Sequence, residues 1–224
     1  MSCAQCRGIA EQFDTRAARR QLRKLRRRGP DRSTRLLIKG VREALGTTQR
    51  GTVLLDVGSG VGAIPEALLS GPVERAIYVD ASPASAAVAE EEAERTGCAA
   101  RIEFLQGDFI ELADAISPAD VVTLDRVICC YPDMPRLVAL SAARARAVYG
   151  AVYPRKTWWT HAMLAAVNAL LRARRSDFRV FLHPPAEIDR ALREGGFGPP
   201  ERRVTLFWIA AIYRRETGVA APAG

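Results

Sequence analysis

Apolar positions near the start of the chain recur every three or four residues, the period of an amphipathic helix. The first run contains Ile9, Phe13, Ala17, Leu22 and Leu25. Gly29 and Pro30 then break the pattern and predict the end of a first helix. A second run contains Leu37, Val41 and Leu45, and we expect Ser33 or Thr34 to cap its helix and Gly46 to end it.

From residue 52 onward, short continuous apolar runs alternate with amphipathic stretches. The predicted strands lie at 52–57, 75–80, 101–109, 119–125 and 148–154. The helices between them include one through Leu68 and Leu69, one over 83–96 and one over 134–147. Ser82 and Pro83 are typical of a helix start, and Gly97 of a helix end. Apolar strands between helices predict a parallel sheet that is covered on both faces.

The last part of the chain follows a different pattern. A helical insert is predicted over 157–175 and a short helix over 184–197, and "RRVTLFWIAAIYRR" then gives one or two strands without a helix between them. This order predicts an antiparallel edge on the sheet. We therefore expect an α/β doubly wound sheet of about seven strands over 51–215, preceded by an N-terminal helical cap over 1–50 and followed by a flexible tail over 216–224.

Length and composition fit one sizeable globular domain, because 224 residues are enough to bury a core. No apolar run reaches the roughly 18 residues of a membrane span, and the start lacks the apolar stretch of a signal peptide. The five cysteines are an odd number without framework spacing, so structural disulfides are not expected. We predict a cytoplasmic protein.

The net charge of +8 is concentrated in one segment. Residues 16–42 carry a larger positive excess than the whole chain, which leaves the remainder slightly acidic. Such a segment can contact nucleic acid, anionic lipid or an anionic substrate, or it can be the solvated face of a helix.

"LLDVGSGVGAI" at 54–64 joins a strand, a glycine-rich turn and a helix start. These parts together form a ligand cradle at the carboxyl edge of a sheet. Gly58, Gly60 and Gly62 have the spacing G-x-G-x-G, whereas the pyrophosphate fingerprint has G-x-G-x-x-G. Asp56 would repel a pyrophosphate but favour a cationic amino group. The turn therefore predicts a ligand with a positive end and a nucleoside, and it disfavours a dehydrogenase.

Acidic residues also end the next three strands. Asp80 is placed to accept both hydroxyls of a ribose, Asp108 can accept from an adenine amino group, and Asp125 closes the fourth strand. Each acid alone is also typical of a cap or turn. All four in order predict a crevice at one edge of the sheet.

"LLDVGSGVGAI", "YVDAS", "LQGDF" and "DVVTLD" resemble, in order and spacing, the motifs of the class I S-adenosylmethionine-dependent methyltransferases, over about residues 50 to 213. The resemblance implies a Rossmann-like fold and S-adenosylmethionine as cofactor, with S-adenosylhomocysteine as product. Asp56 and the glycine turn would surround the methionine part, Asp80 the ribose, and Asp108 with Phe109 the adenine. The implied cofactor residues are Asp56, Gly58, Ser59, Gly60, Gly62, Asp80, Ala81, Asp108, Phe109, Asp125 and Arg126.

The methyl acceptor is less determined by the sequence. "DRVICCYPD" stands where many base-amino methyltransferases have an "NPPY" type of motif, and with "RRRGPDRST" it weakly resembles proteins related to magnesium-protoporphyrin methyltransferases. We expect in-line transfer to a small-molecule acceptor, with an anionic one suggested by the basic turn. The alternatives are an RNA or ribosome methyltransferase, which the basic segment favours, and a non-catalytic module that kept the fold.

A general base is needed only for an acceptor that enters protonated. The candidates are His161, His183, Tyr131 and Asp133. The N-terminal helices and the insert are expected to complete the acceptor pocket. Its candidate contacts are Arg28, Arg32, Arg155 and Trp158, although anchoring of the insert is the simpler role for Trp158. No metal is expected, because the C-x-x-C pair of Cys3 and Cys6 has no second pair.

Overall fold

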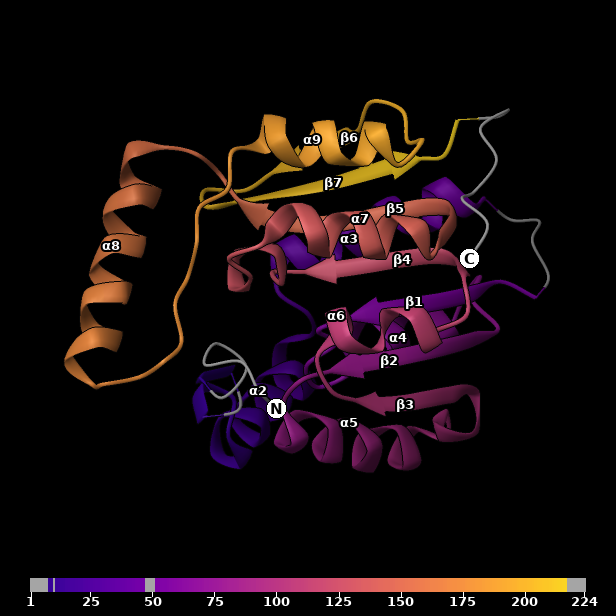
Figure 1. The fold of residues 1–224 in the computed structure, drawn as a ribbon. Coiled ribbons are helices and arrows are strands. Elements are labelled where there is room, and N and C mark those ends of the chain that lie inside the picture. The colour runs from indigo at the N-terminus through magenta and orange to yellow at the C-terminus, as the bar shows by residue number, and fades with distance from the viewer. Residues whose placement is uncertain (1–7, 10, 47–50, 217–224) are drawn as a thin grey trace.

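A computed structural model describes residues 8–9, 11–46 and 51–216 of the chain. In this part, seven strands form one sheet in the order β3-β2-β1-β4-β5-β7-β6 (Figure 1). The strands are β1 (Val53–Val57), β2 (Arg75–Asp80), β3 (Ile102–Gln106), β4 (Ala119–Asp125), β5 (Ala145–Pro154), β6 (Glu201–Val204) and β7 (Trp208–Arg214). The first five pair in parallel, and β7 and β6 pair antiparallel at one edge. The predicted doubly wound sheet with an antiparallel end is confirmed.

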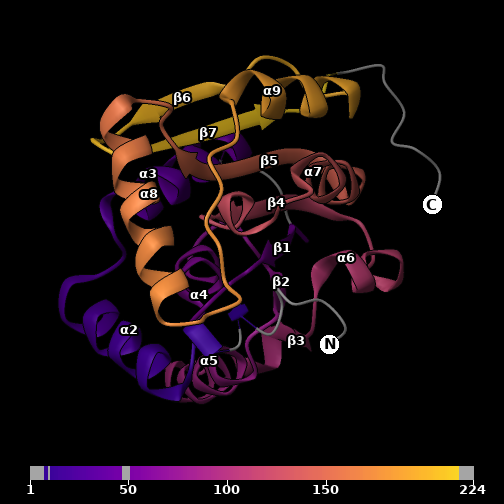
Figure 2. The ribbon, with the colours of Figure 1, turned by 60° about the vertical axis from the view of Figure 1, so that its left-hand side comes forward.

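Helices cover both faces of this sheet. They are α2 (Thr15–Arg28), α3 (Arg32–Leu45), α4 (Ala63–Leu69), α5 (Pro83–Thr96), α6 (Phe109–Leu112), α7 (Met134–Ala143), α8 (Trp158–Ala173) and α9 (Pro185–Glu194). The helices α3 and α4 pack on one face, and α6, α7 and α9 on the other. The helices α2 and α8 lie at the end toward which the parallel strands point (Figures 1 and 2).

The apolar strands are buried on both sides, as the continuous runs predicted. Leu55 and Val122 are paired neighbours on β1 and β4 and face the core under α7 and α9. Leu54 and Val121, one residue earlier on each strand, face the core under α3 and α4. Because successive side chains point to opposite faces, each strand contributes to two cores and needs apolar residues at every position.

The starts of the first two long helices differ from the prediction. The helix α2 begins only at Thr15, because Asp14 caps it by accepting a hydrogen bond of 2.7 Å from the backbone nitrogen of Ala17. Ser33 and Thr34 do not cap α3. They lie buried inside its first turn, and the cap position belongs to Asp31, directly after Pro30.

Two boundaries further along the chain also shift. The predicted third strand ends at Gln106, because Asp108 caps α6 by accepting from the backbone nitrogen of Ile110 at 3.0 Å. The strand β5 begins at Ala145, inside the predicted helix, since buried Ala145 and exposed Arg146 already alternate as strand residues do. Cys3, Cys6 and the predicted tail beyond residue 216 lie outside the described residues.

Of the helices that the structure describes, none has the length and apolar character needed to cross a bilayer.

The close packing of α3 on the sheet gives a stability prediction. A Cβ atom on Gly40 would lie 2.6 Å from Cγ1 of Ile212 on β7. We expect Gly40→Leu to lower the free energy of unfolding by about 1 to 3 kcal/mol through overpacking. Lys39→Leu, at the next and exposed position of the same helix, should change it by less than about 0.5 kcal/mol. Urea unfolding of both variants checks this, and equal stabilities would contradict the packing described.

Candidate functional site

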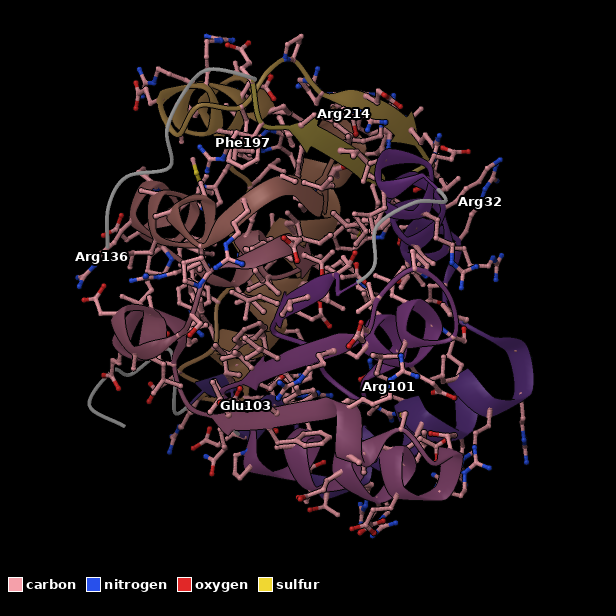
Figure 3. The ribbon with its side chains drawn as sticks, turned by 90° about the vertical axis from the view of Figure 1, so that its right-hand side faces the viewer. Arg32, Arg101, Glu103, Arg136, Phe197 and Arg214 are labelled. Carbon is pink, nitrogen blue, oxygen red and sulfur yellow. The ribbon has the colours of Figure 1, made fainter. Side chains whose placement is uncertain are left out.

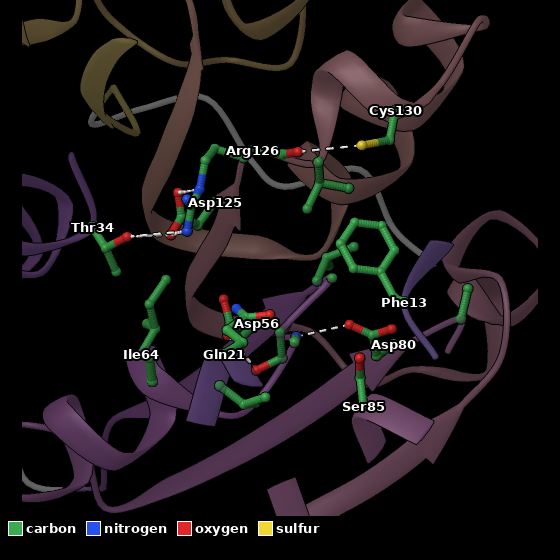
Figure 4. Close-up of a pocket in the computed structure, with 18 of the residues that line it drawn as sticks. Phe13, Gln21, Thr34, Asp56, Ile64, Asp80, Ser85, Asp125, Arg126 and Cys130 are labelled. Carbon is green, nitrogen blue, oxygen red and sulfur yellow. Dashed lines mark hydrogen bonds and ion pairs between the residues drawn. The ribbon is translucent and has the colours of Figure 1, made fainter. Parts of the chain in front are cut away.

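A cavity of about 550 Å³ opens at the carboxyl edge of the sheet, between the strands and α2 (Figure 4). The strands β2 and β4 pair with β1 on its two opposite sides. The chain connections at this edge therefore run in opposite directions and leave a crevice between them. Its lining combines the turn after β1, the ends of β2 and β4, and residues from α2. The predicted crevice is therefore present at the predicted edge.

The glycine turn forms the floor of this cavity. Gly58 has a φ of 66°, and a Cβ atom there would lie 2.3 Å from Cγ2 of Val127. Gly60 has a φ of 58°, and its nearest neighbour in that direction is the side-chain nitrogen of Gln21 on α2. Both positions need glycine for their left-handed backbone. The close approach at Gly58 comes from the chain itself, whereas Gly60 faces α2.

Asp56 lines the cavity near the end of β1 and is 1% exposed. Ser59 donates a hydrogen bond to one of its oxygens, and Thr123 donates to the other at 2.6 Å. Burial raises the pKa of Asp56 to about 7, although both hydroxyl donors act in the opposite direction. The group is therefore poised to gain or lose a proton near neutral pH, and a cation in the cavity would favour its charged form.

Asp80 holds the end of β2 against the glycine turn. Its two oxygens accept from the backbone nitrogens of Gly60 at 2.7 Å and Ser82 at 2.8 Å. Burial raises the pKa of Asp80, and the two backbone donors partly oppose this. Each oxygen uses one lone pair in these bonds, so each keeps acceptor capacity toward the cavity that Asp80 lines.

Asp125 and Arg126 connect the end of β4 to the N-terminal helices (Figure 4). Arg126 donates to both oxygens of Asp125, at 3.1 and 3.2 Å, and pairs with Asp31 at 3.2 Å. Thr34 on α3 donates to Asp125 at 2.6 Å, and Lys24 on α2 binds Asp31 at 2.7 Å. The carboxylates outweigh burial and raise the pKa of Arg126. This network fixes α2 and α3 over the cavity.

Asp108 does not line the cavity, although its neighbours Gly107 and Phe109 do. Besides capping α6, it accepts a hydrogen bond of 2.7 Å from the hydroxyl of Tyr131. The direct contact with adenine expected for Asp108 is therefore not favoured by this geometry. Gly62 ends the turn as the N-cap of α4 and does not line the cavity. All the remaining predicted cofactor residues do line it.

The four predicted base candidates are not brought together. Tyr131 lines the cavity, whereas Asp133 caps α7. His183 donates from Nε2 to the backbone oxygen of Tyr131 at 2.9 Å and is not part of the lining. His161 lies exposed on α8, away from the lining residues. Tyr131 is thus the candidate whose position fits a role in the cavity.

The predicted acceptor contacts lie outside the cavity. Arg28 and Arg32 are exposed at the turn between α2 and α3, and Figure 3 shows Arg32 at the surface. Arg155 donates to the backbone oxygen of Thr205 at 3.1 Å. Trp158 is 78% exposed, so it neither lines the cavity nor anchors the insert. Its neighbour Trp159 provides the anchor, because its ring nitrogen reaches the backbone oxygen of Leu206.

One face of α2 contributes lining residues that the sequence did not single out. They are Ala17, Arg20, Gln21, Lys24 and Leu25, with Gln12 and Phe13 just before the helix. Their helical spacing was visible in the sequence, but the same spacing is typical of a solvated helix face. Which face of α2 turns inward is decided by contacts far along the chain, such as the ion pair of Arg26 with Glu92 on α5.

Among the described residues, no cluster of histidine, cysteine or acidic side chains has the arrangement of a metal site. Cys129 is buried and Cys130 half-buried beside Arg126, to whose backbone oxygen both thiols donate.

Comparison with known proteins agrees with this geometry. Residues 54–148 match the family model described as a methyltransferase domain. This segment, which is less than half of the chain, is similar to methyltransferase domains. The resemblance predicted from the four motifs is therefore confirmed, and the match covers the turn after β1, the ends of β2 and β4, and α7.

A curated relative shares part of the chain. The release factor glutamine methyltransferase of Moorella thermoacetica is 35% identical over 107 residues, which cover 47% of this chain and 35% of that protein. The chain thus matches about a third of the relative's length.

Solved structures share the fold over more of the chain. Magnesium protoporphyrin IX methyltransferase from Synechocystis PCC 6803, solved with bound SAH, has a TM-score of 0.62 at 19% identity and covers 82% of each chain. An O-methyltransferase family protein from Burkholderia thailandensis has a TM-score of 0.66 at 18% identity, over 93% of this chain and 63% of that one. At this identity, the likeness establishes the fold.

The raised pKa of Asp56 predicts a pH-dependent stability. In the unfolded chain this carboxyl titrates at its ordinary value of 3.8, but in the fold only at about 7. Folded Asp56 thus holds its proton more tightly, so its contribution is full below about pH 4 and is lost as the pH rises toward 7. The loss is up to about 4 kcal/mol.

Urea unfolding at about pH 5 and about pH 8 measures this contribution. Asp56→Asn should lose less stability between the two pH values than the unaltered chain. Asp114→Asn, whose side chain is 95% exposed, should behave like the unaltered chain. Parallel pH profiles for the unaltered chain and Asp56→Asn would contradict the prediction.

Proposed function

We propose that the chain is an S-adenosylmethionine-dependent methyltransferase that acts on a small-molecule acceptor. The observation that carries this proposal is the position of the cavity. It lies at the strand-order reversal, most of its lining comes from the matched methyltransferase segment, and Asp56 and Asp80 are on its wall. The relatives named above support the reaction class, since they are methyltransferases and one was solved with SAH.

The cavity offers different surfaces to the different parts of this cofactor. The Asp56 carboxylate is suited to the cationic amino end, because a nearby positive charge stabilises its ionised form. Asp80 keeps acceptor capacity for the two ribose hydroxyls. Ala81 and Phe109 are buried apolar residues of the lining and suit the flat adenine ring. Asp108 contributes indirectly, because it accepts a hydrogen bond from Tyr131, which lines the cavity.

The reaction is an in-line displacement at the methyl carbon. A bond forms between the acceptor atom and the methyl group while the bond from carbon to sulfur breaks, and S-adenosylhomocysteine leaves. Alignment of the two reactants can supply about 7 to 11 kcal/mol of the barrier. The chain provides it by closing α2 over the cavity through the Asp31–Arg126 ion pair. Where the acceptor enters protonated, Tyr131 is the lining side chain placed to take up the acceptor's proton. The hydroxyl of Tyr131 would then pass its own proton to Asp108, to which it donates.

The acceptor is anionic in this proposal. Arg20 and Lys24 lie one helical turn apart on α2 and both line the cavity. Lys24 already pairs with Asp31, whereas no ion pair involves Arg20 among the described residues. A carboxylate or phosphate on the acceptor would neutralise Arg20 at the wall opposite the glycine turn.

The RNA or ribosome alternative is not favoured. Several cations of the basic segment are engaged in the fold, since Arg19 pairs with Glu91 and Arg26 with Glu92. These ion pairs hold α2 against α5, so the positive charge of the basic segment has a structural role.

Loss of the Asp80 carboxylate should weaken cofactor binding. Calorimetric titration of Asp80→Asn with S-adenosylmethionine and S-adenosylhomocysteine should give dissociation constants about 10- to 100-fold higher, because charged hydrogen bonds are lost. Glu103→Gln is the matched control, since Glu103 is exposed on β3 on the far side of the molecule (Figure 3). Absence of binding to the unaltered chain would overturn the proposed function. Equal affinities for both variants would remove Asp80 from the cofactor site.

Arg20 should set the preference for anionic acceptors. Methyl transfer to paired acceptors, each a carboxylate and its neutral amide, should favour the carboxylate. Arg20→Gln should raise KM for the carboxylate by up to about fivefold, since the ion pair stays in contact with water, and leave the amide unchanged. Arg16→Gln, one turn earlier and outside the lining, is the control. A preference that survives Arg20→Gln would contradict this role.

A further inference from the structure

The helix α8 projects from the end of the molecule toward which the parallel strands point (Figures 1 and 2). The connection from α8 to α9 returns beside it and is held there by Asn168, which exchanges two hydrogen bonds with the backbone of Val180, at 2.8 and 2.9 Å. Leu171 is buried beside Ile9 and Phe178. One side of α8 is thus fixed to the rest of the fold.

The opposite side of α8 is apolar and exposed. Trp158 is 78% exposed and Leu170 51%, whereas Val167, 38% exposed, lies about half a turn around the helix from Trp158. The exposed alanines Ala162, Ala165, Ala166, Ala169 and Ala173 continue this surface at helical spacing. The remaining large apolar side chains that the structure describes as exposed, Val204 and Leu206, belong to the hairpin of β6 and β7, to which Trp159 attaches α8. Exposed apolar surface gathered at one end of a molecule marks a contact site.

The charges around this face have a single sign. From Arg155 to Arg175 the chain contains no aspartate or glutamate. Lys156 precedes the helix, and Arg172, Arg174 and Arg175 end it, all four exposed. Within the described part of the chain, none of these four forms an ion pair with an acidic side chain. The face is therefore an apolar strip with cations at both ends.

We propose that the outer face of α8 binds the surface of a lipid bilayer that contains anionic lipids. Apolar side chains would enter the boundary between headgroups and acyl chains, and the terminal cations would reach lipid phosphates. A tryptophan such as Trp158 is suited to that boundary, because its ring is apolar and its N–H is polar. The inference does not rest on the proposed methyl transfer.

A second copy of the chain fits this face less well. In a two-fold symmetric contact the same surface meets itself. Two copies of α8 would then bring Arg172, Arg174 and Arg175 together with cations of the partner, with no acidic residue between 155 and 175 to compensate them. An anionic bilayer supplies the opposite charge along the whole face.

The inner side of α8 contacts the cavity lining. Leu171 at the end of α8 packs in one cluster with Ile9, Phe13, Ala81 and Cys130, all of which line the cavity. The proposed bilayer surface would therefore lie across α8 from these lining residues.

Vesicle flotation of the full chain tests the proposal without any cofactor. The probes are vesicles of phosphatidylcholine alone and of phosphatidylcholine mixed with phosphatidylglycerol. We expect binding to the mixed vesicles only, together with a blue shift of tryptophan emission that Trp158→Gln abolishes. The double variant Trp158→Gln and Leu170→Gln changes exposed positions, so it should keep its circular dichroism and lose binding at least about tenfold.

A matched pair of charge variants distinguishes binding through the outer face of α8 from attraction by the net charge of the chain. Replacing Arg172, Arg174 and Arg175 by Gln should weaken binding about 100-fold, roughly fivefold for each arginine. Replacing Arg16, Arg23 and Arg27, which are exposed on α2, by Gln changes the net charge equally and should have little effect.

Three results would overturn the proposal. The first is no binding of the unaltered chain to mixed vesicles, and the second is equal binding to both vesicle types. The third is an equal loss in the two charge variants, which would mean that net charge alone attracts the chain. A dimer in light scattering that the double variant abolishes would assign the face to a second copy instead.

Discussion

Burial of carboxylates at the reversal of strand order is the constraint on which the site depends. Asp56 lies one residue before the end of β1, between the neighbouring strands β2 and β4, where the sheet leaves almost no contact with water. An ionised carboxylate in such a place is costly unless it is hydrogen-bonded or neutralised. Ser59 and Thr123 donate to it, yet its pKa stays raised to about 7. The fold therefore keeps the Asp56 carboxyl partly protonated near neutral pH, and a cationic ligand in the cavity would favour its ionised form.

The same constraint explains why the N-terminal helices belong to the site. Asp125 at the end of β4 is paired with Arg126 from within the chain and accepts a hydrogen bond from the hydroxyl of Thr34. Arg126 in turn binds Asp31, which Lys24 also holds. Ion pairs of this kind contribute little individually when they face water. Their combined effect here is geometric, because they place α2 over the cavity.

The sequence predicted the sheet, the edge that carries the cavity and most of the strand-end residues that line it, because these depend on local patterns. Apolar runs marked β1 to β5, and the acids at their ends lie at one edge, as parallel strands require. The exception was Asp108, whose side chain caps α6 and binds Tyr131. A helix cap and a ligand contact have the same sequence signature, since both place an acid directly after a strand.

The helical wall of the cavity could not be predicted in the same way, because its residues come from α2 rather than from strand ends. On α2, Arg20 lines the cavity but Arg28, about two turns later, does not, although the lining resumes at Gly29 directly after the helix. On α8, Trp158 and Trp159 are adjacent, but one is exposed and the other is fixed to the hairpin. The roles of such residues follow from long-range packing, which helical spacing alone does not encode. For the same reason, an apolar helix that the sequence suggests as a lid can instead leave its outer face free for contact outside the fold.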